Sequence, residues 1–132
     1  GNIPKIDEKC SSGWYFSPTV IENLSEDSIL NQEEIFGPVV TLNTFKDENE
    51  AVEMANNSDY GLASIIWTDD MNRAQKLAKV VESGLVWINC WLERDLRTPF
   101  GGIKNYGFGK EGGTYGLDFF TESKNICTKY YD

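Results

Sequence analysis

The feature that most constrains this chain is a regular alternation of apolar runs and amphipathic runs between residues 39 and 89. Residues 39–45, 62–67 and 85–89 are short apolar runs rich in β-branched and aromatic side chains, which is typical of buried strands. Between them, residues 51–55 and 71–81 carry apolar side chains at helical spacing. Strands that alternate with helices through short connections predict an α/β fold with a mainly parallel sheet and flanking helices.

The boundaries of the two predicted helices carry recognisable signals. Asp47 followed by Glu50 resembles a capping box at the start of the first helix. Asp69 or Asp70 provides the N-cap of the second helix, and Gly84 is predicted to be its C-terminal stop.

Weaker elements flank this core pattern. Residues 14–23 are aromatic and β-branched around Pro18, which favours an edge or irregular strand. Residues 25–32 and 115–120 each suggest no more than a short helical turn. Residues 124–130 alternate enough to form a last strand, although the chain offers no obvious partner for it.

Composition bounds the class of protein. The 132 residues are 40% hydrophobic and 13% aromatic, which predicts a single domain with enough apolar material for a core. A net charge of −9 disfavours nucleic acid and anionic membrane surfaces as partners. We find no signal peptide and no apolar run long enough to span a bilayer, so we expect a cytoplasmic protein.

The residues available for chemistry are limited. The chain has no histidine, so any catalysis would need a carboxylate, a thiolate or a group supplied from elsewhere. Its three cysteines, Cys10, Cys90 and Cys127, are an odd number without paired spacing, which argues against a disulfide framework and a zinc site; we expect no metal. Cys90 follows a predicted strand and could be a nucleophile or simply a small buried residue.

Residues 96–113, LRTPFGGIKNYGFGKEGG, hold six of the twelve glycines and follow the carboxyl end of the predicted strand at 85–89, where ligands gather in parallel sheets. Residues 107–112 match the G-x-G-x-x-G pattern of dinucleotide sites. That fingerprint requires a strand directly before it, a helix directly after it and an acidic residue about twenty residues on. A long loop precedes this match and no helix is predicted directly after it, so we interpret the pattern as incidental.

Two groups of residues are candidates for ligand binding. Glu34 and Phe36, in EEIFGPV, form either an acidic turn that caps a strand or a site in which the carboxylate binds a ribose diol and the ring packs on a flat heterocycle. Arg94 and Arg97 either pair with the neighbouring Glu93 and Asp95 or bind a carboxylate bidentately. In the second case, Trp91 and Phe100 would cover the organic part of the ligand.

Five blocks of sequence, in order, resemble the C-terminal part of an aldehyde dehydrogenase. They are EEIFGPV at 33–39, ANNSDYGLA at 55–63, GLVWIN at 84–89, TPFGGIKNYGFGKEGG at 98–113 and TESK at 121–124. The segment WLERDLRTPFGG is most similar to the branch that oxidises 2-aminomuconic or 2-hydroxymuconic semialdehydes. Two positions depart from the usual family pattern: Tyr106 replaces a small serine and Lys110 replaces an arginine.

The resemblance implies a role for each candidate residue. Glu34 would hold the nicotinamide ribose of NAD and Phe36 would contact the nicotinamide. Phe100 would line the aldehyde pocket, with Arg94 and Arg97 at its mouth to recognise the carboxylate of a small-molecule semialdehyde acid. No catalytic residue is expected in this chain, because the family's cysteine nucleophile, its glutamate base and its phosphate-binding domain correspond to sequence upstream of residue 1.

The resemblance also implies a domain organisation. Residues 1–13 would be a lead-in, residues 14–122 part of the catalytic domain, and residues 123–132 an arm that pairs with a neighbouring subunit in a homo-oligomer. The chain alone would be inactive, whereas the complete enzyme would oxidise an aldehyde to an acid through a cysteine thioester. Two alternatives stay open: a non-catalytic binding or assembly module of the same fold, and a small dinucleotide-binding protein that uses residues 107–112.

Overall fold

A computed structural model describes residues 4–131 of the chain. It divides into two compact units, Gly1–Ser58 and Asp59–Asp132, which are described separately below. The predicted lead-in and the predicted arm extend into residues 1–3 and 132, which lie outside the described residues.

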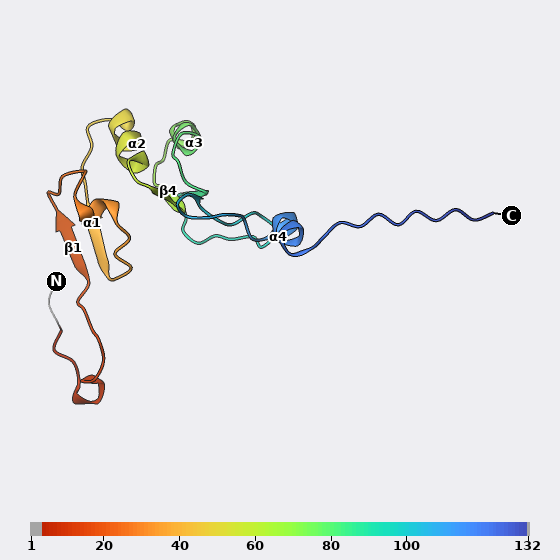
Figure 1. Cartoon of the computed structure of the whole chain (residues 1–132). Helices are drawn as coiled ribbons and strands as arrows, with labels where there is room; N and C mark the ends of the chain where they lie inside the picture. The colour runs from red at the N-terminus through yellow and green to blue at the C-terminus, as the bar shows by residue number, and fades with distance from the viewer. Residues whose placement is uncertain (1–3, 132) are drawn as a thin grey trace. The chain divides into compact units, whose positions relative to one another are not determined.

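The first unit is built on a pair of parallel strands. Strand β1, Thr19–Glu22, pairs with β2, Val39–Leu42, in a register that places Thr19 opposite Val39. The two strands lie side by side in Figure 1. The remaining elements of this unit are the 3-10 helix η1, Glu8–Cys10, and the helices α1, Ile29–Gln32, and α2, Glu48–Asn56.

The second unit contains another parallel pair. Strand β4, Ala63–Ile66, pairs with β5, Leu85–Ile88, and helix α3, Met71–Ala78, connects them. A short antiparallel pair joins β3, Tyr60–Gly61, to β6, Ile103–Lys104. Helix α4, Gly113–Phe120, follows and is drawn in blue in Figure 1.

The α/β class predicted from the sequence is confirmed, with parallel pairing in both longer strand pairs. The strands do not form one sheet, however. In the part of the chain that the structure describes, β2 pairs with β1 rather than with β4, and there are three separate two-stranded sheets. Each sheet therefore has open edges, and isolated two-stranded sheets are marginally stable in water.

The predicted helix starts are confirmed by their caps. Asp47 accepts hydrogen bonds from the backbone N–H groups of Asn49 and Glu50, at 2.9 and 3.0 Å. Asp70, rather than Asp69, caps α3. The pKa of the Asp70 carboxyl group is lowered, mainly by the hydrogen bond that it accepts from the backbone N–H of Arg73. Accepting such bonds stabilises the ionised form.

The predicted stop at Gly84 is wrong, because α3 already ends at Ala78. Gly84 is needed for another reason. A Cβ atom at this position would collide with the carbonyl group of Gly101 and lie 2.9 Å from the Cα of Gly102. The glycine therefore allows the start of β5 to approach the glycine-rich loop.

The chain buries very little apolar surface. Among the described residues, Ala74 is the one buried hydrophobic side chain. The expectation that this composition forms a core of its own is therefore wrong, since the apolar side chains of two-stranded sheets have no second layer to pack against.

The C-terminal segment differs from its prediction in two ways. Helix α4 has eight residues instead of a single turn. Residues 121–131 form no helix and pair with no strand in the described chain, and Figure 1 draws them without an arrow. The oligomerisation strand stays a prediction, because a pairing with another subunit lies outside a single chain. Within residues 4–131, no helix is long and apolar enough to cross a membrane.

Candidate functional site

The loop that carries the two arginines, residues 90–113 and here called the arginine loop, begins at the carboxyl ends of β4 and β5. Asn89 directly precedes it with a φ of 53°. The Asn89 side chain accepts from the N–H of Thr68 at 2.9 Å and donates to the Thr68 carbonyl oxygen at 2.7 Å. These two bonds join the ends of neighbouring parallel strands, so the loop starts from a defined point of the sheet.

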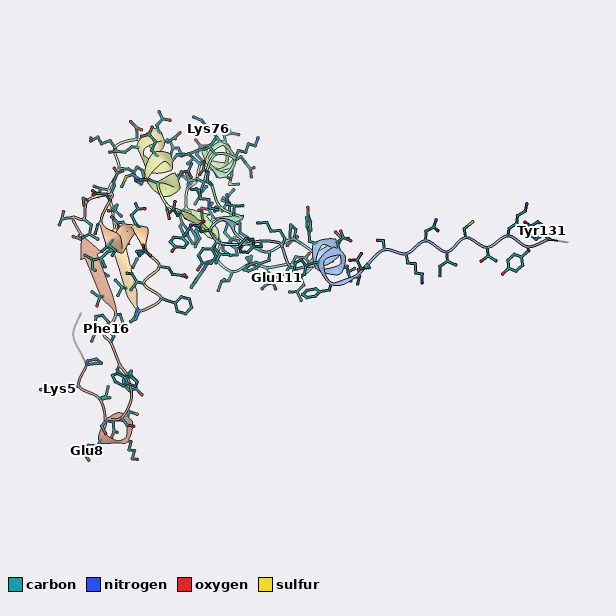
Figure 2. All side chains as sticks on the ribbon, in the orientation of Figure 1. Lys5, Glu8, Phe16, Lys76, Glu111 and Tyr131 are labelled. Carbon is teal, nitrogen blue, oxygen red and sulfur yellow. The ribbon has the colours of Figure 1, made fainter. Side chains whose placement is uncertain are left out.

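Arg94, Phe100 and Glu111 form a cluster within the arginine loop. The guanidinium carbon of Arg94 lies 4.0 Å from the centre of the Phe100 ring. Its Nη2 donates to Oε1 of Glu111 at 2.7 Å. Phe100 and Glu111 also exchange both backbone hydrogen bonds, at 2.7 and 2.8 Å. Figure 2 labels Glu111 in the segment that precedes α4.

Arg97 has different surroundings. Its Nε and Nη2 donate to both carboxylate oxygens of Asp95, with Nη2 2.5 Å from Oδ2. The pair lowers the pKa of Asp95 and raises the pKa of Arg97, each mainly through the side-chain hydrogen bond between them. The Arg97 side chain is 89% exposed. The prediction that an arginine pairs with a neighbouring acid is thus confirmed for Arg97 and Asp95.

For Arg94 the predicted pairing with Glu93 is wrong. Its partner is Glu111, 17 residues further along the chain. Glu111 was missed as a candidate, because the patterns that contained it were interpreted through their glycines. The sequence holds no local signal for such a pair, which depends on how the loop folds back.

Glycines allow the arginine loop to fold back on itself. Gly112 and Gly113 have φ values of 85° and 52°, in the left-handed region that favours glycine. A Cβ at Gly113 would collide with the carbonyl oxygen of Arg97. The N–H of Gly113 donates to the carbonyl oxygen of Leu96 at 3.0 Å. These glycines therefore bring the two ends of residues 96–113 into direct contact.

Tyr106 and Lys110, the two positions that depart from the family pattern, both lie within the arginine loop. Lys110 donates from Nζ to the carbonyl oxygens of Gly101 and Gly102, at 2.5 and 2.7 Å. The rings of Tyr106 and Tyr60 meet edge to face, 5.7 Å apart. Both side chains therefore have structural contacts within the second unit.

The G-x-G-x-x-G match is followed by a helix after all, since α4 begins at Gly113. The expectation that no helix follows is therefore wrong. The strand requirement is still not met, because β6 has only two residues and is paired antiparallel. Gly112 and Gly113 allow the backbone to approach residues 96–98 closely. Within the described residues, no parallel strand follows α4, as a dinucleotide-binding unit would require.

The second candidate region is residues 33–39, here called the cofactor segment, which lies at the entrance to β2. Phe36 has a φ of 50° and is 91% exposed. A bulky residue in the left-handed region is strained, and such strain is concentrated at functional sites. The side chain of Glu34 is also exposed. Both residues belong to the first unit, whereas the arginine loop belongs to the second.

No candidate catalytic centre is visible in the described part of the chain. Cys10 and Cys127 are exposed, Cys90 is partly buried, and all three are free. None has a histidine near it, because the chain contains none. Among residues 4–131, no three acidic or cysteine side chains form a group that could hold a metal ion.

The chain belongs to the aldehyde dehydrogenase family, whose model matches residues 1–126. It is 47% identical over 129 residues to the 2-hydroxymuconic semialdehyde dehydrogenase of Pseudomonas putida, covering 98% of this chain and 26% of that protein. It is also 47% identical over 119 residues to the human 2-aminomuconic semialdehyde dehydrogenase, covering 90% of this chain and 24% of that protein. The chain thus spans about a quarter of these relatives.

The similarity extends to solved structures. The betaine aldehyde dehydrogenase of Staphylococcus aureus, solved with NAD+, matches with a TM-score of 0.84 and 41% identity, over 89% of this chain and 23% of that one. The Mycobacterium tuberculosis aldehyde dehydrogenase, also solved with NAD+, matches with a TM-score of 0.81 and 38% identity, over 89% and 24%. The predicted family and its α/β architecture are therefore confirmed.

Proposed function

We propose that this chain is the C-terminal part of an NAD-dependent aldehyde dehydrogenase that oxidises an aldehyde carrying a carboxylate, such as a muconic-type semialdehyde, to an acid. Membership of the family supports the reaction class. The names of the relatives in Pseudomonas putida and human support the substrate class. The nucleophile, the base and the phosphate-binding domain would belong to the rest of that enzyme.

The observation that carries the substrate class is the position of Arg94 on the Phe100 ring. An aromatic face desolvates one side of a guanidinium without using its N–H donors. The bond to Glu111 uses one of the five donors, and Arg94 makes no other hydrogen bond to the residues that the structure describes. Arg94 therefore retains donors for a ligand carboxylate, whereas Arg97 has Nε and Nη2 committed to Asp95.

The cofactor segment fits the nicotinamide end of NAD. Phe36 presents an exposed ring, and the carboxylate of Glu34, two residues away, can accept hydrogen bonds from a ribose diol. NAD, when bound, would supply the hydride acceptor. In this proposal, the two residues orient the nicotinamide end, and the exposed aromatic face stays available until a flat ring covers it.

The domain boundaries follow from the same proposal. Residues 14–122 would complete the catalytic domain, and the extended residues 123–132 would pair with a neighbouring subunit of a cytoplasmic homo-oligomer. The large exposed apolar surface supports this view, because the apolar side chains need cover from other parts of an enzyme.

The first test uses the purified chain with NAD and an aliphatic acid semialdehyde. We expect no NADH above a blank, because the cysteine that acts as the family's nucleophile would belong to the rest of the enzyme. Formation of NADH would refute the claim that the nucleophile lies elsewhere. Retention of NAD that depends on the glycines at 107–112 would instead favour a small dinucleotide-binding protein.

The second test addresses the substrate class in the complete enzyme, meaning the protein that carries residues 1–132 as its C-terminal part. Arg94→Ala should lower kcat/KM for the acid semialdehyde by about 10- to 100-fold, the value of a charge-assisted hydrogen-bonded pair. The methyl ester of the same semialdehyde, which carries no negative charge, should be affected much less. Arg97→Ala is the matched control, and we expect it to have a smaller effect. Equal losses on acid and ester would contradict a carboxylate-binding role.

A further inference from the structure

Glu111, the partner of Arg94, bonds to Phe100 through its backbone and to Arg94 through its side chain. Phe100 and Glu111 face each other as a bridged pair with two backbone hydrogen bonds. The backbone positions that carry the ring and the carboxylate are therefore held opposite each other. The guanidinium is held from two sides, by the ring face at 4.0 Å and by the carboxylate oxygen at 2.7 Å.

We propose that Glu111 is a positioning residue that determines specificity for acidic aldehydes by holding Arg94 against Phe100. The inference rests on the proposed function, in which Arg94 binds the substrate carboxylate. An arginine side chain loses considerable rotamer freedom when it engages a ligand. A guanidinium that is already held loses less on binding, so the affinity for the carboxylate is higher.

The carboxylate of Glu111 also has an opposing effect. A negative charge beside Arg94 repels a second carboxylate, and the Arg94 and Glu111 side chains are 40% and 63% exposed. At such exposure, water and salt screen charges strongly, which weakens the repulsion. Screening weakens the Arg94–Glu111 attraction as well, but the hold on Arg94 also includes a directional hydrogen bond at 2.7 Å and the contact with the Phe100 ring, so we expect positioning to exceed the repulsion. Glutamine at this position would retain an acceptor oxygen for Arg94 without the charge.

The experiment measures kcat and KM of the complete enzyme for the acid semialdehyde and for its methyl ester. Glu111→Ala should lower the acid-to-ester ratio of kcat/KM about tenfold, mainly through a higher KM for the acid. Glu111→Gln should restore the ratio to the wild-type value or above it. Glu93→Gln is the matched control, because it removes a neighbouring carboxylate that does not pair with Arg94, and it should leave the ratio unchanged.

A double-mutant cycle separates this inference from the proposed function. In the Arg94→Ala background, Glu111→Ala should cause no further change in the ratio, because the residue it positions is gone. An Arg94→Ala effect without a Glu111→Ala effect would overturn the positioning role and leave the proposed function intact. If Arg94→Ala leaves the ratio unchanged, the proposed function itself fails. A Glu111→Ala effect of the same size in both backgrounds, or equal loss of kcat on both substrates, would also overturn the inference. Should Glu111→Ala not fold, Glu111→Asp, one methylene shorter, provides the same test.

Discussion

The arginine loop and the cofactor segment differ in how much of their geometry this chain makes for itself. In the arginine loop, the backbone bridge between Phe100 and Glu111, the ion pair of Arg94 with Glu111 and the bonds of Lys110 to two carbonyl oxygens connect residues that are 8 to 17 positions apart in sequence. The cofactor segment instead presents a Phe36 ring that is 91% exposed. Contacts within this chain therefore preorganise the arginine loop, whereas the Phe36 ring has little contact with the first unit.

The largest effect is expected from replacing the glycine that allows the arginine loop to fold back. Gly113→Ala would place a Cβ against the Arg97 carbonyl at a φ of 52°. We expect a loss of about 2–4 kcal/mol in stability from strain and collision together, measured as the free energy of unfolding of the complete enzyme. Gly116→Ala is the matched control, since its added Cβ would have no atom of another segment within 4 Å, and it should be neutral or stabilising. Equal effects of the two would show that the loop is not rigid.

The exposed ring of Phe36 should matter for NAD binding more than for stability. Phe36→Ala should raise KM for NAD about tenfold, because it removes an aromatic contact of about 1.5 kcal/mol. Its effect on stability should be small, since the ring is 91% exposed. Phe45→Ala, at another exposed aromatic of the first unit, is the control and should leave KM for NAD unchanged. An equal rise in both variants would argue against a specific contact at Phe36.

The smallest expected effect concerns Asp95, whose pKa is lowered by the hydrogen bonds from Arg97. A carboxyl group with a lowered pKa in the folded state stabilises the protein above its unfolded pKa, near 3.8, and loses this contribution as the pH falls through the folded value. Asp95→Asn should therefore lower the melting temperature slightly at pH 7, and the difference from the wild type should vanish in acid below the folded pKa. A difference that persists at low pH would indicate a role in packing rather than in charge.

Much of the fold could be predicted from local patterns. The caps at Asp47 and Asp70 and the strand runs at β2, β4 and β5 depend on residues within one turn or one strand of each other. The pairing of Arg97 with Asp95 is local in the same way. Such features follow from capping, periodicity and proximity, which a sequence displays directly.

Features that depend on contacts between distant segments were not predictable in this way. The pairing of β2 with β1 and the pairing of Arg94 with Glu111 rather than Glu93 both involve such contacts. Local chemistry alone left the two arginines equivalent, because each stands beside an acidic residue. The backbone bridge between Phe100 and Glu111 breaks this equivalence, since it brings a distant carboxylate and a ring to Arg94 alone.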